Sequence, residues 1–281
     1  MGALLQHLQT LSVLVFLVSS MGAIGLALTP RAIGAPLRDQ RFVLLALVLN
    51  FVLAPALAWL LTRVIPLDRA HAAGLLLLGG AAGAPFLPKL VENARGDLAS
   101  AAALMALLTA GTILFLPFAL PLMIPGLNAD PWSIARPLLM LIIGPLAAGM
   151  LIKSRAGTFA ARVAPVLAKL GNTSLLLLFV LLVALNARAL LAVIGSGAIL
   201  AALIFFTALF VCGWLFGGSQ RGVLSLATAA RNFGAALAPA ESCFDDPKVT
   251  VMIIVGAIVC LVVTFTAAGW VRRKTPVPRS A

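Results

Sequence analysis

The chain has 281 residues, of which 62% are hydrophobic and only 10% are charged. A soluble domain is roughly 45–50% apolar and about 25% charged, so this composition excludes an ordinary water-soluble protein. A net charge of +12 would suggest nucleic acid in a soluble chain, but in a membrane protein the distribution of charge between loops must be judged first. We therefore predict an all-α membrane protein that forms a single transmembrane domain over residues 1–281, with the lipid bilayer and no nucleic acid as its partner.

Apolar stretches of roughly 20 residues, the length that spans a bilayer, recur along the whole chain. About nine transmembrane helices are predicted, over residues 8–28, 42–63, 70–90, 98–124, 132–152, 168–187, 189–216, 220–240 and 249–271. The first is expected to be a true span rather than a cleavable signal peptide, because no positively charged region precedes it. The third and eighth are rich in Gly, Ala and Pro, and each carries a charge.

The basic residues predict an orientation. With the N-terminus outside, thirteen Lys and Arg residues fall in inner loops and the C-terminal tail, five fall in outer loops, and two remain within the spans. The positive-inside rule favours this arrangement in a bacterial-type inner membrane. It places Trp59 and Trp132 at the outer interface and Trp214 and Trp270 at the inner one, the depth that Trp rings prefer. The C-terminus is therefore expected to be cytoplasmic.

The third predicted span contains an irregular segment, Leu78 to Lys89, with three glycines and two prolines. A broken helix is tolerated at membrane depth only where it is buried in protein or lines a cavity. The segment therefore predicts either a site around Gly83 or close helix packing by small residues. Lys89 either belongs to that site or extends to the inner interface by snorkelling.

The eighth predicted span carries Arg231 and Asn232 in the middle of an apolar stretch. An ionisable residue inside the membrane is costly and indicates a functional site, unless the Arg reaches an interface or a helix C-terminus. Two interrupted segments at corresponding places in two halves indicate a transporter binding site. Asn50, followed by Pro55, adds an amide and a kink to the second span, although ordinary interhelical hydrogen bonding also explains it. The candidate substrate-binding residues are Arg231, Asn232, Asn50, Lys89, Thr228 and Gly83.

No enzyme constellation is visible. His7 and His71 lack ligand spacing, and no catalytic or nucleotide-binding motif occurs. Cys212, Cys243 and Cys260 show no paired metal spacing, and nearly all of the eight acidic residues fall in loops. We therefore expect no enzyme activity, no cofactor and no metal site.

The two irregular segments and their surroundings resemble the bile acid:sodium symporter family. The matching stretches are Gly25–Pro30, Phe51–Leu61, Gly79–Gly83, Ala94–Asp97 and Ala227–Asn232. The resemblance implies an inverted-repeat transporter fold with two five-helix repeats, of which some members lack the first helix. Nine helices with the N-terminus outside fit the shortened form. The two broken crossing helices of the family then correspond to residues of about 70–90 and 220–240.

The departures from the family pattern concern sodium. Where the family binds sodium, this chain has residues without a suitable side-chain oxygen, namely Leu87, Pro88, Ala101, Met105, Ala227 and Arg231. Asn50 and Asn232 keep the amides that the resemblance implies. We therefore expect that neither family sodium site survives. Arg231, with or without Lys89, is then a fixed cation where sodium would have bound.

The leading interpretation is a secondary transporter for a small organic anion that is not coupled to sodium. One alternative is a sodium-coupled, bile-acid-like symporter whose ligands are backbone carbonyls. Another is a non-transporting membrane sensor with the same fold, which would have a closed crossover without a lined cavity.

Overall fold

The computed structural model describes residues 2–27, 36–124, 132, 135–136, 139–185 and 187–274. Over these ranges the chain is helices and turns, with no strand among the described residues, so the all-helical prediction is confirmed. Six helices are long and apolar enough to cross a membrane, and they cover residues 7–27, 40–64, 98–123, 157–185, 198–216 and 247–274. The full count of nine stays a prediction, and residues 133–134 and 137–138 of the predicted span 132–152 lie outside the described residues.

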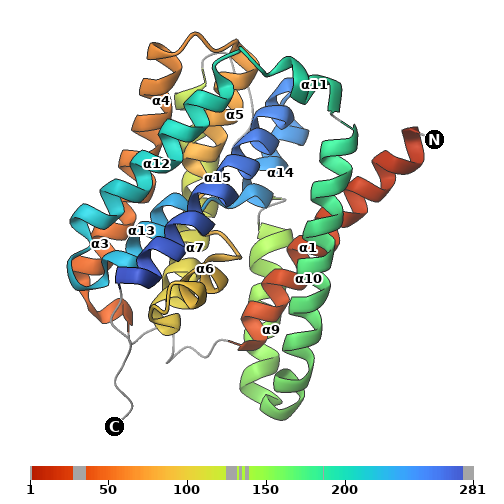
Figure 1. Ribbon diagram of the computed structural model, residues 1–281. Coiled ribbons are helices and arrows are strands. Elements are labelled where there is room, and N and C mark those ends of the chain that lie inside the picture. Colours follow the sequence, from red (N-terminus) through yellow and green to blue (C-terminus); the bar gives the residue numbers. More distant parts are fainter. Residues whose placement is uncertain are drawn as a thin grey trace.

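Two groups of helices stand side by side in Figure 1. The smaller group consists of α1 (Gly2–Ala27), α9 (Gly144–Arg155) and α10 (Gly157–Leu185). Within it, glycines allow the backbones of α1 and α9 to touch, since a Cβ on Gly25 would lie 2.2 Å from the Leu146 carbonyl oxygen. Close approach through small residues is how membrane helices associate without a hydrophobic driving force.

The larger group contains the remaining long helices. Its members are α3 (Gln40–Val48), α4 (Ala54–Val64), α5 (Arg69–Gly80), α6 (Leu87–Asn93), α7 (Leu98–Met123), α12 (Ala198–Phe216), α13 (Arg221–Ala229), α14 (Phe233–Cys243) and α15 (Pro247–Lys274). A short helix, α11 (Ala187–Ala192), follows α10 and contacts both α10 and α15. One turn of π-helix, Leu49–Leu53, connects α3 to α4, and another, Leu139–Ile143, precedes α9.

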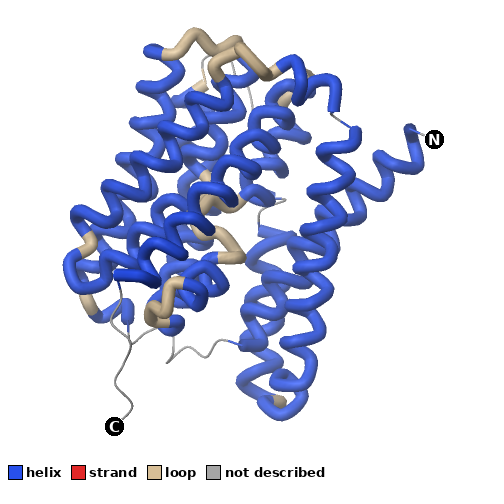
Figure 2. The backbone as a smooth tube through the Cα atoms, in the orientation of Figure 1, coloured by secondary structure: helices blue, strands red, loops and turns tan. Residues whose placement is uncertain are grey.

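Both segments that were predicted to be irregular are interrupted. Residues 81–86 separate α5 from α6, and residues 230–232 separate α13 from α14. Figure 2 shows this non-helical backbone in tan inside the bundle as well as at its ends. The two breaks therefore supply free backbone groups within the protein interior, where lipid cannot reach them.

Two predicted helix boundaries were wrong. The helix expected at 168 begins at Gly157, because the charged residues taken as a loop extend α10 with exposed side chains such as Arg162. The helix expected over 189–216 is divided, because Gly195 (φ +90°) and Gly197 (φ +80°) take left-handed conformations between α11 and α12. Glycine adopts these conformations without the steric cost of a Cβ.

Acidic residues cap several helices at their N-termini, which satisfies amides that lack intrahelical partners. Asp68 caps α5 by accepting a hydrogen bond from the His71 amide at 2.8 Å, and it also lies 3.3 Å from Nζ of Lys248. Partial burial alone would raise the pKa of Asp68, but the His71 amide, the His71 ring and the Lys248 ammonium together lower it. This contact joins the start of α5 to the start of α15.

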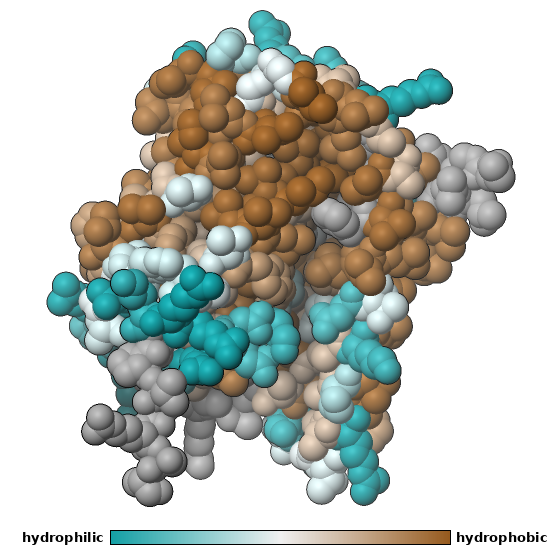
Figure 3. Space-filling model, in the orientation of Figure 1, coloured by the Kyte–Doolittle hydropathy of each residue, from teal (hydrophilic) through white to brown (hydrophobic). Residues whose placement is uncertain are grey.

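The surface of the larger group is strongly apolar. Figure 3 shows a broad brown band with hydrophilic, teal residues above and below it, most of them at the lower end. Leu114 and Leu122 on α7 are 71% and 86% exposed. Exposed side chains of this kind are stable against lipid tails, which is consistent with the membrane environment.

Candidate functional site

The two helix breaks meet in the interior of the larger group. The backbone N–H of Asn232, in the second break, donates a hydrogen bond of 2.9 Å to the carbonyl of Ala81, in the first. Residues 81–84 and 230–232 are buried, and Pro85 and Phe86 are partly exposed. Residues that are far apart in the sequence therefore form one crossing point, which we call the crossing.

Two threonines of α7 satisfy the backbone of the first break. The hydroxyl of Thr112 accepts from the Ala82 amide at 2.8 Å and lies 3.0 Å from the Ala82 carbonyl. The hydroxyl of Thr109 donates to the carbonyl of Gly83 at 3.0 Å. Buried backbone groups need such partners, so these hydroxyls allow the helix to be interrupted.

Gly83 is required at its position for two reasons. Its φ of +82° is the left-handed conformation that favours glycine. A Cβ there would also lie 2.4 Å from the backbone nitrogen of Thr109. Gly83 thus has a structural role at the crossing, and its side-chain hydrogen brings α7 against the break.

The second break presents polar groups that have no protein partner. Asn232 caps α14 by accepting from the Ala235 amide at 3.1 Å, but its buried side-chain amide nitrogen has no hydrogen-bond partner within the described residues. All three guanidinium nitrogens of Arg231 are likewise buried and unpartnered there. The guanidinium lies over the Phe205 ring, whose centroid is 5.9 Å from Cζ.

An isolated buried cation is costly, and it is normally paired or hydrogen-bonded. Arg231 directly precedes Asn232, the N-cap residue of α14. A helix N-terminus favours negative charge. Two consecutive residues therefore contribute a buried cation, an unpartnered amide and a helix N-terminus, which are groups whose chemistry suits an anion.

Thr228 and Asn50 use their polar groups locally. The hydroxyl of Thr228 donates to the Leu224 carbonyl at 2.7 Å, within its own helix. The side-chain amide of Asn50 donates to the Ala46 carbonyl at 2.9 Å, so this bond is not the interhelical one that was considered from the sequence. Its Oδ1 is buried without a partner in the described part of the chain.

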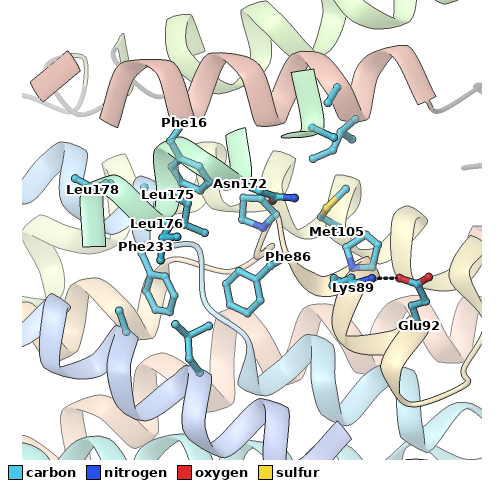
Figure 4. Close-up of a pocket in the computed structure, with 18 of the residues that line it drawn as sticks. Phe16, Phe86, Lys89, Glu92, Met105, Asn172, Leu175, Leu176, Leu178 and Phe233 are labelled. Carbon is cyan, nitrogen blue, oxygen red and sulfur yellow. Dashed lines mark hydrogen bonds and ion pairs between the residues drawn. The ribbon is translucent and has the colours of Figure 1, made fainter. Parts of the chain in front are cut away.

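Lys89 lies apart from Arg231. Its ammonium is exposed and lies 2.7 Å from Oε2 of Glu92, one turn further along α6. Figure 4 shows this ion pair at one end of a cavity, with Phe86 and Phe233 on the wall. Arg231 is not among the residues that line this cavity, so the two cations do not share it.

The cavity has a volume of about 990 Å³ and lies between the two groups of helices. Its walls come mainly from α1 and α10 on one side and from α6, α14 and α15 on the other, and they are almost wholly apolar. Phe86, the last residue of the first break, and Phe233, the residue that follows the second break, stack with ring centroids 5.7 Å apart. The cavity therefore reaches the crossing at these rings.

The described residues contain no group of three or more His, Cys, Asp or Glu side chains that could hold a metal ion. Sequence reasoning singled out Arg231, Asn232 and Gly83, and the structure brings the two breaks that carry them together. Sequence reasoning did not identify Thr109 and Thr112. Their signal in the sequence is a pair of hydroxyls three residues apart, and hence on one face of a long apolar helix.

Helices that are interrupted inside an apolar, all-helical bundle and meet beside a cavity are typical of proteins that carry substrates across membranes. The family model described as the Sodium Bile acid symporter family matches residues 14–193, well over half of the chain, and the chain belongs to this family of membrane transporters. No curated protein sequence matches the chain. The matched range contains the first break and ends before the second, which carries Arg231.

Proposed function

We propose that this protein is a secondary transporter that carries a small organic anion across a bacterial inner membrane without sodium coupling. Its N-terminus would be outside and its C-terminus cytoplasmic, as the loop charges indicate. The observation that carries the proposal is the guanidinium of Arg231, which is fully buried at the crossing and has no partner among the described residues.

The electrostatic argument starts from the cost of that burial. Removing a cation from water has an effective penalty of several kcal/mol unless a counter-charge or hydrogen bonds compensate it. A carboxylate or similar anion would supply both, because guanidinium binds such groups with two parallel hydrogen bonds. The unpartnered amide of Asn232 could donate a further bond to the same anion.

The resemblance supports the absence of sodium coupling. Ala101, Met105 and Ala227, which stand where the family has oxygen ligands, are buried and carry no side-chain oxygen. A fixed positive charge at Arg231 would in addition repel a sodium ion. Asn50 is the exception, since its buried, unpartnered oxygen leaves one ligand for a cation; sodium coupling through this amide and backbone carbonyls is therefore the second candidate.

The cavity supports transport over a sensor function. A sensor with the same fold would need no lined path to the crossing, whereas a cavity of about 990 Å³ leads to Phe86 and Phe233. Binding pockets for small molecules have roughly 300–1,000 Å³ and are mostly apolar. The apolar walls favour an anion with an apolar body, and the exposed Lys89 lies at the cavity's end.

The test is uptake of a panel of organic acids into proteoliposomes, with either sodium or choline outside. We expect equal uptake in both, loss of uptake in Arg231→Met, and partial uptake in Arg231→Lys. Arg162→Met is the matched control, because it removes an exposed positive charge on α10. Normal uptake by Arg231→Met would refute the anion site, and an absolute need for sodium would refute the coupling.

A further inference from the structure

A second site lies at the end of α12, α13 and α15, away from the crossing. Three aromatic residues, Phe210, Trp214 and Trp270, form a cluster there, which we call the Trp cluster. The two indole rings meet edge to face with centroids 4.7 Å apart, and Phe210 lies 6.2 Å from Trp270. The contact joins α12 to the last turns of α15.

Each indole ring of the Trp cluster has a cation over it. Cζ of Arg221, the first residue of α13, lies 4.4 Å from the Trp214 ring centroid, and Nζ of Lys274 lies 6.0 Å from that of Trp270. Arg272 and Arg273, beside Lys274, are exposed as well. Cation–π contacts hold such side chains over aromatic faces without neutralising their charge.

These four positive charges are not paired. No ion pair joins any of them to a carboxylate within the ranges that the structure describes. The acidic residue in the neighbouring hollow at the turn between α12 and α13 is Asp39, which shares that hollow with Arg41. The end of the bundle therefore has a surplus of positive charge, and it matches the teal region at the lower end of Figure 3.

Exposed apolar side chains lead directly to this charge. On α15 they recur at helical spacing, with Ile258 36%, Val262 62% and Trp270 41% exposed, and the same face ends at Arg273. Gly269, on this face, has no heavy atom within 4 Å of the position of a Cβ, so the surface is open there. An apolar track that ends in cations and Trp rings has the polarity of a phospholipid.

We propose that the Trp cluster and its four cations bind an anionic phospholipid, with the phosphate between Arg221 and Lys274 and the acyl chains along α15. A headgroup with two phosphates suits the site best, because the cations come from two separate helix ends and lie over two different rings. Basic clusters at the ends of membrane helices bind such headgroups. The site requires only that this end of the bundle lies at a membrane surface, and it is independent of the transported substrate.

The test is native mass spectrometry of the full-length protein in detergent, titrated with diphosphatidylglycerol, phosphatidylglycerol or phosphatidylcholine of equal chain length. We expect the affinity to fall in that order. Arg221→Gln with Lys274→Gln should weaken binding of diphosphatidylglycerol about 25-fold, which is about fivefold per removed charge. The control pair Arg155→Gln with Arg162→Gln removes the same net charge from α9 and α10 and should leave binding unchanged.

Three outcomes would overturn the proposal. They are equal affinity for phosphatidylcholine, an equal loss in the control pair, and full competition by soluble glycerol phosphate, which would show a site for phosphate alone. Arg231→Met should keep the lipid affinity of the wild type. A failure here and a failure of anion transport are therefore separate results.

Discussion

The unpartnered cation at the crossing leads to an unusual stability prediction, that Arg231→Met makes the protein more stable. The guanidinium is fully buried without a hydrogen-bond partner among the described residues, and its Cζ lies 5.9 Å from the centroid of the Phe205 ring. Such a contact contributes up to ~2 kcal/mol when desolvated, whereas burying the charge costs several kcal/mol. Met fills much of the same volume without a charge, so a gain of about 1–4 kcal/mol is expected.

The assay is thermal unfolding of the purified protein in detergent without any organic anion. A gain of this size corresponds to a rise in Tm of about 2 °C or more. Leu226→Met, a buried and nearly volume-conserving change in α13, is the control and should give no gain. If Arg231→Met lowers the Tm, the guanidinium has stabilising contacts in the resting protein, and the argument for an open anion site fails.

Further predictions concern the crossing and the N-terminal end of α5. Gly83→Ala should lower the Tm by an amount equivalent to about 1–3 kcal/mol of overpacking against Thr109. Thr112→Val should cost about 1–3 kcal/mol, because buried backbone groups lose their partner, and Thr112→Ser should restore most of it in the same thermal assay. The Tm difference between wild type and Asp68→Asn should be present at pH 7, since the lowered pKa stabilises the folded state above the ordinary value of 3.8, and should disappear as the pH falls through the folded-state pKa. In a variant that lacks the Lys248 ammonium, Asp68→Asn should change the Tm by less than it does in the wild type.

The interrupted helices were predictable where the sequence departs from the pattern of a regular apolar helix. Glycine and proline density revealed the first break, because such residues destabilise a regular helix. An Arg–Asn pair in an apolar span revealed the second, at Arg231 and Asn232, and Asn232 caps the next helix. In contrast, Pro239 lies inside α14 and does not mark the break. Local composition thus identified the interrupted spans but not the residue at which each helix ends.

The partners of these residues were not predictable in the same way. A hydroxyl in an apolar helix usually bonds to its own backbone, as Thr228 does. Thr109 and Thr112 bond to another segment instead, which depends on how α7 packs. Whether Arg231 has a hydrogen-bond partner likewise depends on all the elements that surround it, and not on its own span alone. The separation of Lys89 from Arg231 follows from packing as well, since the Lys89 ammonium is exposed beside Glu92 while Arg231 is fully buried.

A cation that is covalently attached to the carrier has a consequence for energy conversion. A sodium ion enters and leaves in each cycle, so its charge offsets that of a transported anion and its gradient drives uptake. The charge of Arg231 never leaves the protein. Under the proposed mechanism, each cycle with a monovalent anion then moves one net negative charge, which a membrane potential of 100 mV, negative inside, favours outward by ~2.3 kcal/mol. The membrane voltage would therefore drive export of the anion rather than its accumulation.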